Sequence, residues 1–184
     1  RDFVRPKGTV SASYAISPEW TVRGNVERRV GQLGFGNFIT TVNLQDVNST
    51  AGNDNIVPDQ RWVFGAEVQR NIAVGLSGTV TAEVQLLEDQ IENIRFADGS
   101  FGPGNINGGN QYSLEADLTW VLDKLVTPGL RLGLQGGVFE SDLDDPITGE
   151  TRAFSGSTDW FYEVNARYDI PNSPWAFESE IEQF

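Results

Sequence analysis

The chain has 184 residues, enough for one domain or two at most, and 26 acidic against 13 basic residues give a net charge of −13. It contains no Cys, His or Met, which excludes disulfides, thiolate or imidazole metal sites and a Ser-His-Asp triad from these residues. An acidic chain without basic clusters is also a poor candidate for nucleic-acid binding, which depends on neutralising phosphates. We expect neither a cofactor nor an enzyme activity.

Apolar and polar residues alternate along most of the chain, with the period of a β-strand and not of a helix. The clearest case runs from Leu76 to Leu86, where apolar residues and Gly78 take one face and Ser, Thr, Glu and Gln take the other. In chain order the alternation predicts eight strands, at about Thr9–Ile16, Trp20–Val30, Arg61–Gln69, Leu76–Leu86, Gln111–Trp120, Leu130–Val138, Trp160–Tyr168 and Trp175–Gln183.

The connections between these strands alternate in length. The long ones are rich in Gly, Asn, Asp and Ser, and we expect them to be loops. Alternating short and long connections are typical of outer-membrane barrels, which have short periplasmic turns and long extracellular loops. The short connections are Ser17–Glu19, Asn71–Gly75, Asp123–Gly129 and Pro171–Pro174, and the long ones are Gly31–Gln60, Glu88–Asn110 and Ser141–Ser157.

Alternation by itself also fits a soluble antiparallel sheet with one buried and one wet face. The aromatic residues favour a membrane barrel, because they stand on the apolar face near both ends of the strands, as in the two girdles at the membrane interfaces. Eight strand residues tilted by about 40° rise roughly 20 Å, close to the apolar band of about 25 Å. The predicted girdle residues are Trp20, Trp62, Tyr112, Trp120, Trp160, Tyr168 and Trp175.

The opposite face carries charges of both signs, including Arg23, Glu67, Glu115 and Arg167. Unpaired buried charge is very costly, so these residues require a wet or plugged lumen, or a tightly packed network inside a small barrel. We therefore predict an all-β fold, an antiparallel transmembrane β-barrel segment. The alternatives are a passive porin or small structural barrel complete in itself, and a soluble acidic β-sandwich that binds carbohydrate.

Several stretches resemble TonB-dependent outer-membrane receptors. The resemblance is carried first by the stretch from Arg5 to Arg70, in which residues 5–38 read like a strand pair from the second, C-terminal half of their barrels. Within the same stretch, Ala51–Ile72 resembles a family segment that enters a Trp-led strand. Asp54 departs from this pattern, since the family usually has Pro there, and Asp59 often corresponds to Glu. The matching residues of this segment are Gly52, Asn53, Ile56, Pro58, Asp59 and Trp62, and the later stretches DPITGETRAFSG and DWFYEVNARYDIPNSPWAF look like a following hairpin.

The resemblance implies a barrel of about 22 strands around a plug, in the outer membrane of a Gram-negative bacterium. It implies energised import of a scarce nutrient such as a siderophore, cobalamin or a saccharide, with the TonB system as a partner. We expect residues 1–184 to be a single-domain, internal segment of such a barrel, because both ends of the predicted strand order fall on the extracellular side. Membrane lipid, the rest of the barrel and the plug would then be its neighbours.

Two groups of residues are candidates for ligand contact. Aromatic and Arg side chains are common anchors in recognition, which makes the two luminal arginines and the loop phenylalanines candidates for binding a small molecule or oligosaccharide. The acidic residues of the third long connection could bind Ca²⁺ through hard oxygen ligands, but they lack EF-hand spacing, which favours a solvated acidic loop over a calcium site. The candidates are Arg23, Arg29, Phe35, Phe38, Phe96 and Phe101 for the ligand, and Asp142, Asp144 and Asp145 for calcium.

Overall fold

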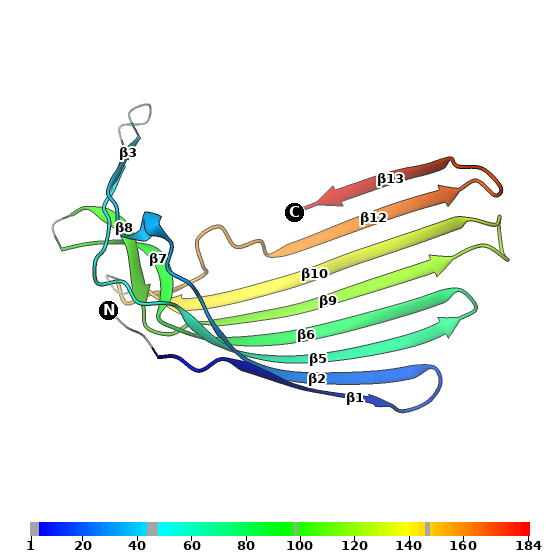
Figure 1. The fold of residues 1–184 in the computed structure, drawn as a ribbon, viewed down its shortest axis with the longest axis horizontal. Coiled ribbons are helices and arrows are strands. Elements are labelled where there is room, and N and C mark those ends of the chain that lie inside the picture. Colours follow the sequence, from blue (N-terminus) through cyan, green and yellow to red (C-terminus); the bar gives the residue numbers. More distant parts are fainter. Residues whose placement is uncertain (1–3, 44–47, 98, 146–147) are drawn as a thin grey trace.

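The structure, a computed structural model, describes residues 4–43, 48–97, 99–145 and 148–184. Its main element is one antiparallel sheet whose eight long strands lie side by side in chain order (Figure 1). The predicted all-β class and the eight predicted strands are thus confirmed. The strands are β1 (Gly8–Ala15), β2 (Trp20–Val30), β5 (Gln60–Ala73), β6 (Leu76–Glu88), β9 (Asn110–Val121), β10 (Leu130–Asp144), β12 (Trp160–Asp169) and β13 (Ala176–Gln183).

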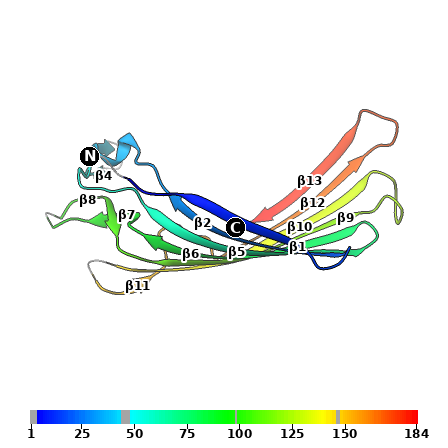
Figure 2. The same ribbon diagram turned by 60° about the horizontal axis from the view of Figure 1, so that its bottom comes forward.

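The long strands form a single curved layer, as Figure 2 shows. Among the described residues, β1 pairs only with β2 and β13 pairs only with β12, so the sheet is open at both edges. A β-sandwich needs a second sheet packed face to face about 10 Å away, and a complete barrel needs its first and last strands to pair. The described part of the chain forms neither of these.

All four short connections lie at one end of the sheet, which we call the turn end, and the long ones lie at the opposite loop end (Figure 1). Two of the short turns depend on glycine. Gly75 and Gly129 have φ values of +75° and +88°, and a Cβ on them would lie 2.3 Å from the Val121 carbonyl oxygen and 2.0 Å from that of Asp169. Only glycine combines such a φ with such a close approach.

The expectation that the long connections are loops is wrong in part. They contain a second, four-stranded sheet in which β4 and β8 pair in parallel and the other strands pair antiparallel. A single 3₁₀ turn, η1 (Phe35–Asn37), is the helical structure of the described residues, and no helix there is long and apolar enough to cross a membrane. The added strands are β3 (Thr41–Asn43), β4 (Asn48–Thr50), β7 (Gln90–Arg95), β8 (Phe101–Ile106) and, paired with β10, β11 (Thr151–Arg152).

Close backbone contacts hold the first two long connections together. A Cβ on Gly102 of β8 would lie 2.1 Å from the carbonyl oxygen of Ala51, so only glycine allows this approach. The Asn105 side chain accepts a hydrogen bond from the Val57 N–H at 2.8 Å and donates to the carbonyl oxygens of Val57 at 2.8 Å and Asp89 at 2.7 Å. One amide therefore links two connections that are distant in sequence.

Most of the fully buried hydrophobic side chains lie at the loop end. Val63, Leu87 and Leu143 belong to the long strands, and each is at most 4% exposed. Ile56 and Ile106, equally buried, come from the connections that pack over the loop end. The other buried hydrophobic residue among those described, Leu122, lies in a short turn. The molecule thus has a small conventional core at one end and a single-layer wall elsewhere.

Candidate functional site

One face of the long sheet, the apolar face, carries aliphatic side chains over its middle. Cross-strand pairs such as Val68 with Val80, and Val80 with Ala116, follow one another in register across the strands. Val80 is 46% exposed and Leu134 48% exposed, so the described protein leaves this surface uncovered. An extended exposed apolar surface is rare on a soluble monomer and marks contact with lipid or another partner.

The predicted girdle residues lie in two rows on or beside the apolar face. Toward the turn end are Trp20, Trp120 and Tyr168, with Trp175 directly before β13, and toward the loop end are Trp62, Tyr112 and Trp160. All are exposed except Tyr168, which is half-buried. Trp160 also stacks on Tyr162, with ring centroids 6.0 Å apart. The role of these rings at a membrane interface stays a prediction.

An arginine lies over a tryptophan of the apolar face at each end of the sheet. Toward the loop end, the Arg28 guanidinium lies 4.9 Å from the centre of the Trp62 ring. Toward the turn end, the Arg70 guanidinium lies 4.6 Å from the centre of the Trp20 ring. Both contacts have cation–π geometry, which suits a cation that remains near an apolar surface.

Beyond the aromatic row at the loop end, the two faces exchange character. The face that is apolar in the middle of the sheet becomes polar toward the loop end. There Arg28 forms an ion pair with Glu88 at 2.9 Å and donates a hydrogen bond to Gln60 at 2.7 Å. Further along, Asn110 donates to Asp142 at 2.9 Å on the same face. On the opposite face, the charged residues give way to the buried Val63, Leu87 and Leu143. The strands therefore continue past the apolar band into a different environment.

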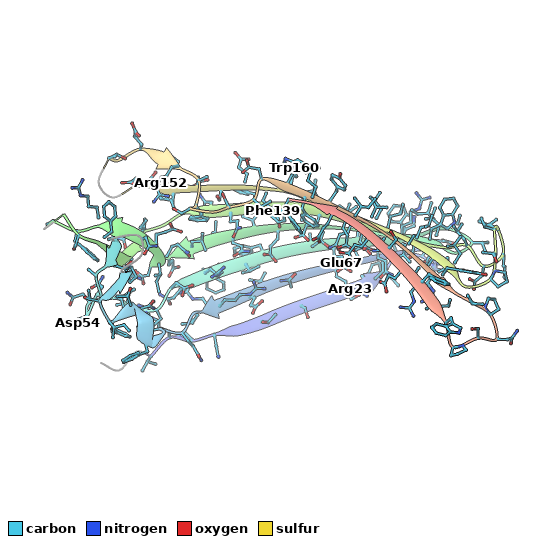
Figure 3. All side chains as sticks on the ribbon, turned by 90° about the horizontal axis from the view of Figure 1, so that it is seen from above. Arg23, Asp54, Glu67, Phe139, Arg152 and Trp160 are labelled. Atoms are coloured by element: carbon cyan, nitrogen blue, oxygen red, sulfur yellow. The ribbon has the colours of Figure 1, made fainter. Side chains whose placement is uncertain are left out.

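The other face, the polar face, pairs most of its arginines. Arg23 of β2 forms an ion pair with Glu67 of β5, and the two are labelled in Figure 3. Arg29 pairs with Glu27 at 2.9 Å, so both arginines predicted to contact ligand already have a carboxylate partner. Ion pairs with exposed faces are compatible with a wet interior, where the cost of desolvating charge is small.

Sequence reasoning missed a row of phenylalanines on the polar face. Phe139 and Phe161 stack with ring centroids 5.8 Å apart, and Phe161 and Phe184 are 6.4 Å apart. A Cβ on Gly137 would lie 2.7 Å from the Phe161 ring, so this glycine provides the space in which the ring lies. The signal was present in the sequence, because Phe139 and Phe161 each follow a residue of the apolar face directly.

The predicted loop phenylalanines lie in the connections at the loop end, whereas Arg23 and Arg29 belong to β2. Phe35, in η1, is 79% exposed, and Phe38 is the residue directly after this 3₁₀ turn. Phe101 is exposed beneath the Arg95 guanidinium, 5.7 Å from its ring centre. Phe96 differs, because its ring lies within 2.9 Å of a Cβ placed on Gly102 and packs on β8. Their contact with a ligand stays a prediction.

The acidic residues considered for calcium each have a partner within the chain. Asp142 accepts from Asn110, Asp144 accepts from the Thr151 hydroxyl at 3.0 Å, and Asp145 pairs with Arg152 at 3.0 Å. Within the described residues, no three acidic side chains are grouped closely enough to hold a metal ion. Calcium binding by these carboxylates would therefore require the loss of their present partners within the chain.

Comparison with known proteins extends this description. No protein-family model matches the sequence, and no curated protein is significantly similar to it. Two similar solved structures are the copper transporter OprC, with a TM-score of 0.68, and the siderophore receptor PirA from Pseudomonas aeruginosa, with a TM-score of 0.60. This chain has the fold of part of a β-barrel wall. Each structure is 13% identical to it in sequence, so the likeness concerns the fold alone.

The alignments cover 95% and 90% of this chain but only 25% of OprC and 36% of PirA. The chain therefore spans between a quarter and about a third of these proteins. Both are TonB-dependent receptors, the class that the sequence resembles, and both are transporters or receptors rather than enzymes. The strand arrangement of this chain is thus that of part of each of the two structures.

Proposed function

We propose that this chain is part of the barrel wall of a TonB-dependent receptor in the outer membrane of a Gram-negative bacterium. The observation that carries the proposal is the open eight-stranded sheet with an exposed apolar band between two rows of aromatic rings. In this arrangement the apolar face contacts lipid, the turn end is periplasmic and the loop end is extracellular. The remaining strands, the plug and the TonB system are proposed partners.

The proposed activity of the whole receptor is energised import of a scarce nutrient, of the siderophore, cobalamin or saccharide class. The name of PirA gives a siderophore, and the name of OprC gives copper. Copper prefers imidazole, thiolate and thioether ligands, and these 184 residues contain no His, Cys or Met. For this part of the wall we therefore propose an organic ligand and not copper.

Aromatic rings at the loop end are the proposed contacts for that ligand. Phe35 and Phe101 present their rings outward, and the row Phe139, Phe161 and Phe184 lies on the polar face near the loop end. Flat rings bury large areas at little cost in side-chain entropy, which suits recognition of catechol, corrin or sugar rings. Arg23 and Arg29 could contribute once ligand competes with their present carboxylate partners.

Spin labelling of β6 tests the membrane part of the proposal, because these 184 residues contain no Cys. Single cysteines replace Val80, Thr81, Ala82 and Glu83 in the whole protein in outer membranes, and a nitroxide is attached to each. We expect labels at 80 and 82 to be relaxed by dissolved oxygen and labels at 81 and 83 by a water-soluble nickel chelate. Equal access of the nickel chelate to all four positions would reject the proposal.

Transport is tested separately in cells. Deletion of the gene is expected to abolish uptake of one nutrient among labelled ferric siderophores, cobalamin and oligosaccharides. Deletion of TonB in the wild-type strain is expected to have the same effect, because the import is energised. Uptake that persists without TonB would instead identify a passive pore, and the wall geometry would then remain while the receptor function would not.

A further inference from the structure

A groove of about 290 Å³ crosses the apolar face near the turn end. Gly78 provides its floor, since a Cβ there would be only 3.3 Å from the Leu118 side chain and 3.4 Å from that of Ile72. Trp20 and Arg70 line one side of it and Leu134 lies at the other. Register places Val80 and Ala116 two residues nearer the middle of the sheet, so the groove leads from the turn-end aromatic row toward the centre of the apolar band.

Arg70 stands at the rim of this groove and differs from Arg28 in its electrostatic partners. Arg28, which lies over Trp62 in the same way, has the Glu88 carboxylate at 2.9 Å. Among the described residues, no carboxylate lies within ion-pairing distance of Arg70, and its recorded contact is the Trp20 ring. A ring face satisfies none of the five N–H donors of a guanidinium. Within the described part of the chain, Arg70 therefore lacks the carboxylate partner that Arg28 has.

We propose that Arg70 binds the phosphate of a phospholipid from the periplasmic leaflet, and that one acyl chain of this lipid lies in the groove. The inference rests on the proposed function, which places the apolar face in the membrane and the turn end at the periplasmic interface. Phosphates lie at the level of the interfacial aromatic rings, and acyl chains run from there toward the centre of the bilayer. In the same way, the Arg70 guanidinium lies at the turn-end aromatic row and the groove runs from it toward the centre of the apolar band.

The chemistry of the two parts favours a lipid over a free anion. A guanidinium presents paired donors that match two phosphate oxygens, and such charge-assisted hydrogen bonds are strong where water is excluded. Apart from Arg70, Thr79 and Asp117, the residues that line the groove are apolar or glycine, so it favours hydrocarbon over a small ion. Trp20 holds the guanidinium at the rim, which lowers the entropy lost when phosphate binds.

The test uses the whole protein in detergent, with dioleoyl phosphatidylglycerol as the probe and native mass spectrometry to count bound lipid. We expect Arg70→Gln to weaken binding of this lipid about tenfold, the effect of losing one charge-assisted hydrogen bond. Gly78→Leu is expected to reduce binding as well, because it fills the groove while Arg70 remains. Dioleoylglycerol, which lacks the phosphate, should bind wild type and Arg70→Gln equally.

Arg131→Gln is the matched control, since it removes the same charge near the same end but from the polar face. It should leave lipid binding unchanged, and a loss equal to that of Arg70→Gln would overturn the proposal by showing an effect of net charge. Displacement of the lipid by soluble glycerol phosphate would overturn the role of the groove. If the β6 spin labels report lipid contact while Arg70→Gln keeps its lipid, only this site fails. If the labels report no lipid contact, the proposed function itself fails.

Discussion

The two ends of the long sheet differ in how their hydrophobic side chains are covered and in whether the arginine over the tryptophan has a carboxylate partner. At the loop end, Val63, Leu87 and Leu143 are buried by the connections above them, and Arg28 over Trp62 has its own carboxylate. At the turn end, the turns are short, and Leu122 is the one buried hydrophobic residue among those described. Arg70 lies over Trp20 there, and no carboxylate of the described residues pairs with it. The loop end is therefore completed by its own chain, and the turn end is completed by its surroundings.

This difference follows from where each end would lie in a barrel. The loop end extends past the apolar band into water, where it needs a hydrophobic core of its own to stay folded. In the proposed barrel the turn end lies at the membrane interface, where lipid would replace a core and the strands must make all their backbone hydrogen bonds internally. The exchange of face character beyond Trp62 marks the boundary between the two regimes.

Replacing Leu143 by Ala should produce the largest effect, because it removes a fully buried side chain from the core of the loop end. Such substitutions cost about 2–5 kcal/mol, so the connections should open far more often. Hydrogen exchange of the whole receptor in detergent should show faster exchange of β7, β8 and β11 with β1 and β2 unchanged. Leu134→Ala, on the exposed apolar face, is the control and should change these rates little. Equal effects of the two would contradict the comparison.

Replacing Asn105 by Ala should come next, because its amide makes three hydrogen bonds between connections. Leaving the Val57 and Asp89 groups unsatisfied costs about 1–3 kcal/mol. The expected result is exchange of the Val57 amide accelerated between about tenfold and a hundredfold. Asn93→Ala on the exposed side of β7 removes the same amide and serves as control. If both variants exchange alike, Asn105 does not connect the two segments.

Replacing Gly129 by Ala tests the turn end. A left-handed φ costs a non-glycine residue about 1–2 kcal/mol, and the new Cβ would also meet the Asp169 carbonyl oxygen at 2.0 Å. Gly149, at the loop end, also has a positive φ of +70° but an open environment, so Gly149→Ala isolates the conformational cost. We expect Gly129→Ala to accelerate exchange in the 122–130 hairpin more than Gly149→Ala does in its own turn. The reverse order would show that the close approach is unimportant.

The wall was predictable because each of its residues faces one of two contrasting environments. Alternation such as that from Leu76 to Leu86 is therefore nearly unbroken, and the strand number and the aromatic rows follow from it. The second sheet was not predictable from the same signal. In β8, Gly102, Pro103 and Gly104 interrupt the pattern. Gly102 lies against the carbonyl oxygen of Ala51 and Gly104 lies against the Ile94 side chain, so these glycines provide space instead of burying a side chain of their own.

The point at which the two faces exchange apolar and polar character is visible in the sequence, although the alternating pattern alone does not show it. Consecutive apolar residues at Leu86–Leu87 and Val138–Phe139 mark the points where the polar face becomes apolar. By contrast, the pairing of Arg23 with Glu67 and the unpaired state of Arg70 depend on the register between β2 and β5. A shift of one residue would move either arginine to the other face, so no single-strand pattern could give them.

The smallest expected effect is that of Arg28→Gln, which removes the anion-paired arginine of the loop end. Its partner Glu88 keeps 48% of its side chain exposed, so the pair should contribute no more than about 1 kcal/mol. Salt screens exposed pairs, so the difference in exchange of residues 84–88 between wild type and variant should shrink between about 0.01 and 1 M salt. Arg70→Gln, which has no carboxylate to lose, should show no salt-dependent change in β5 once lipid is removed. A salt response at Arg70 equal to that at Arg28 would mean that the turn end also supplies its own anion.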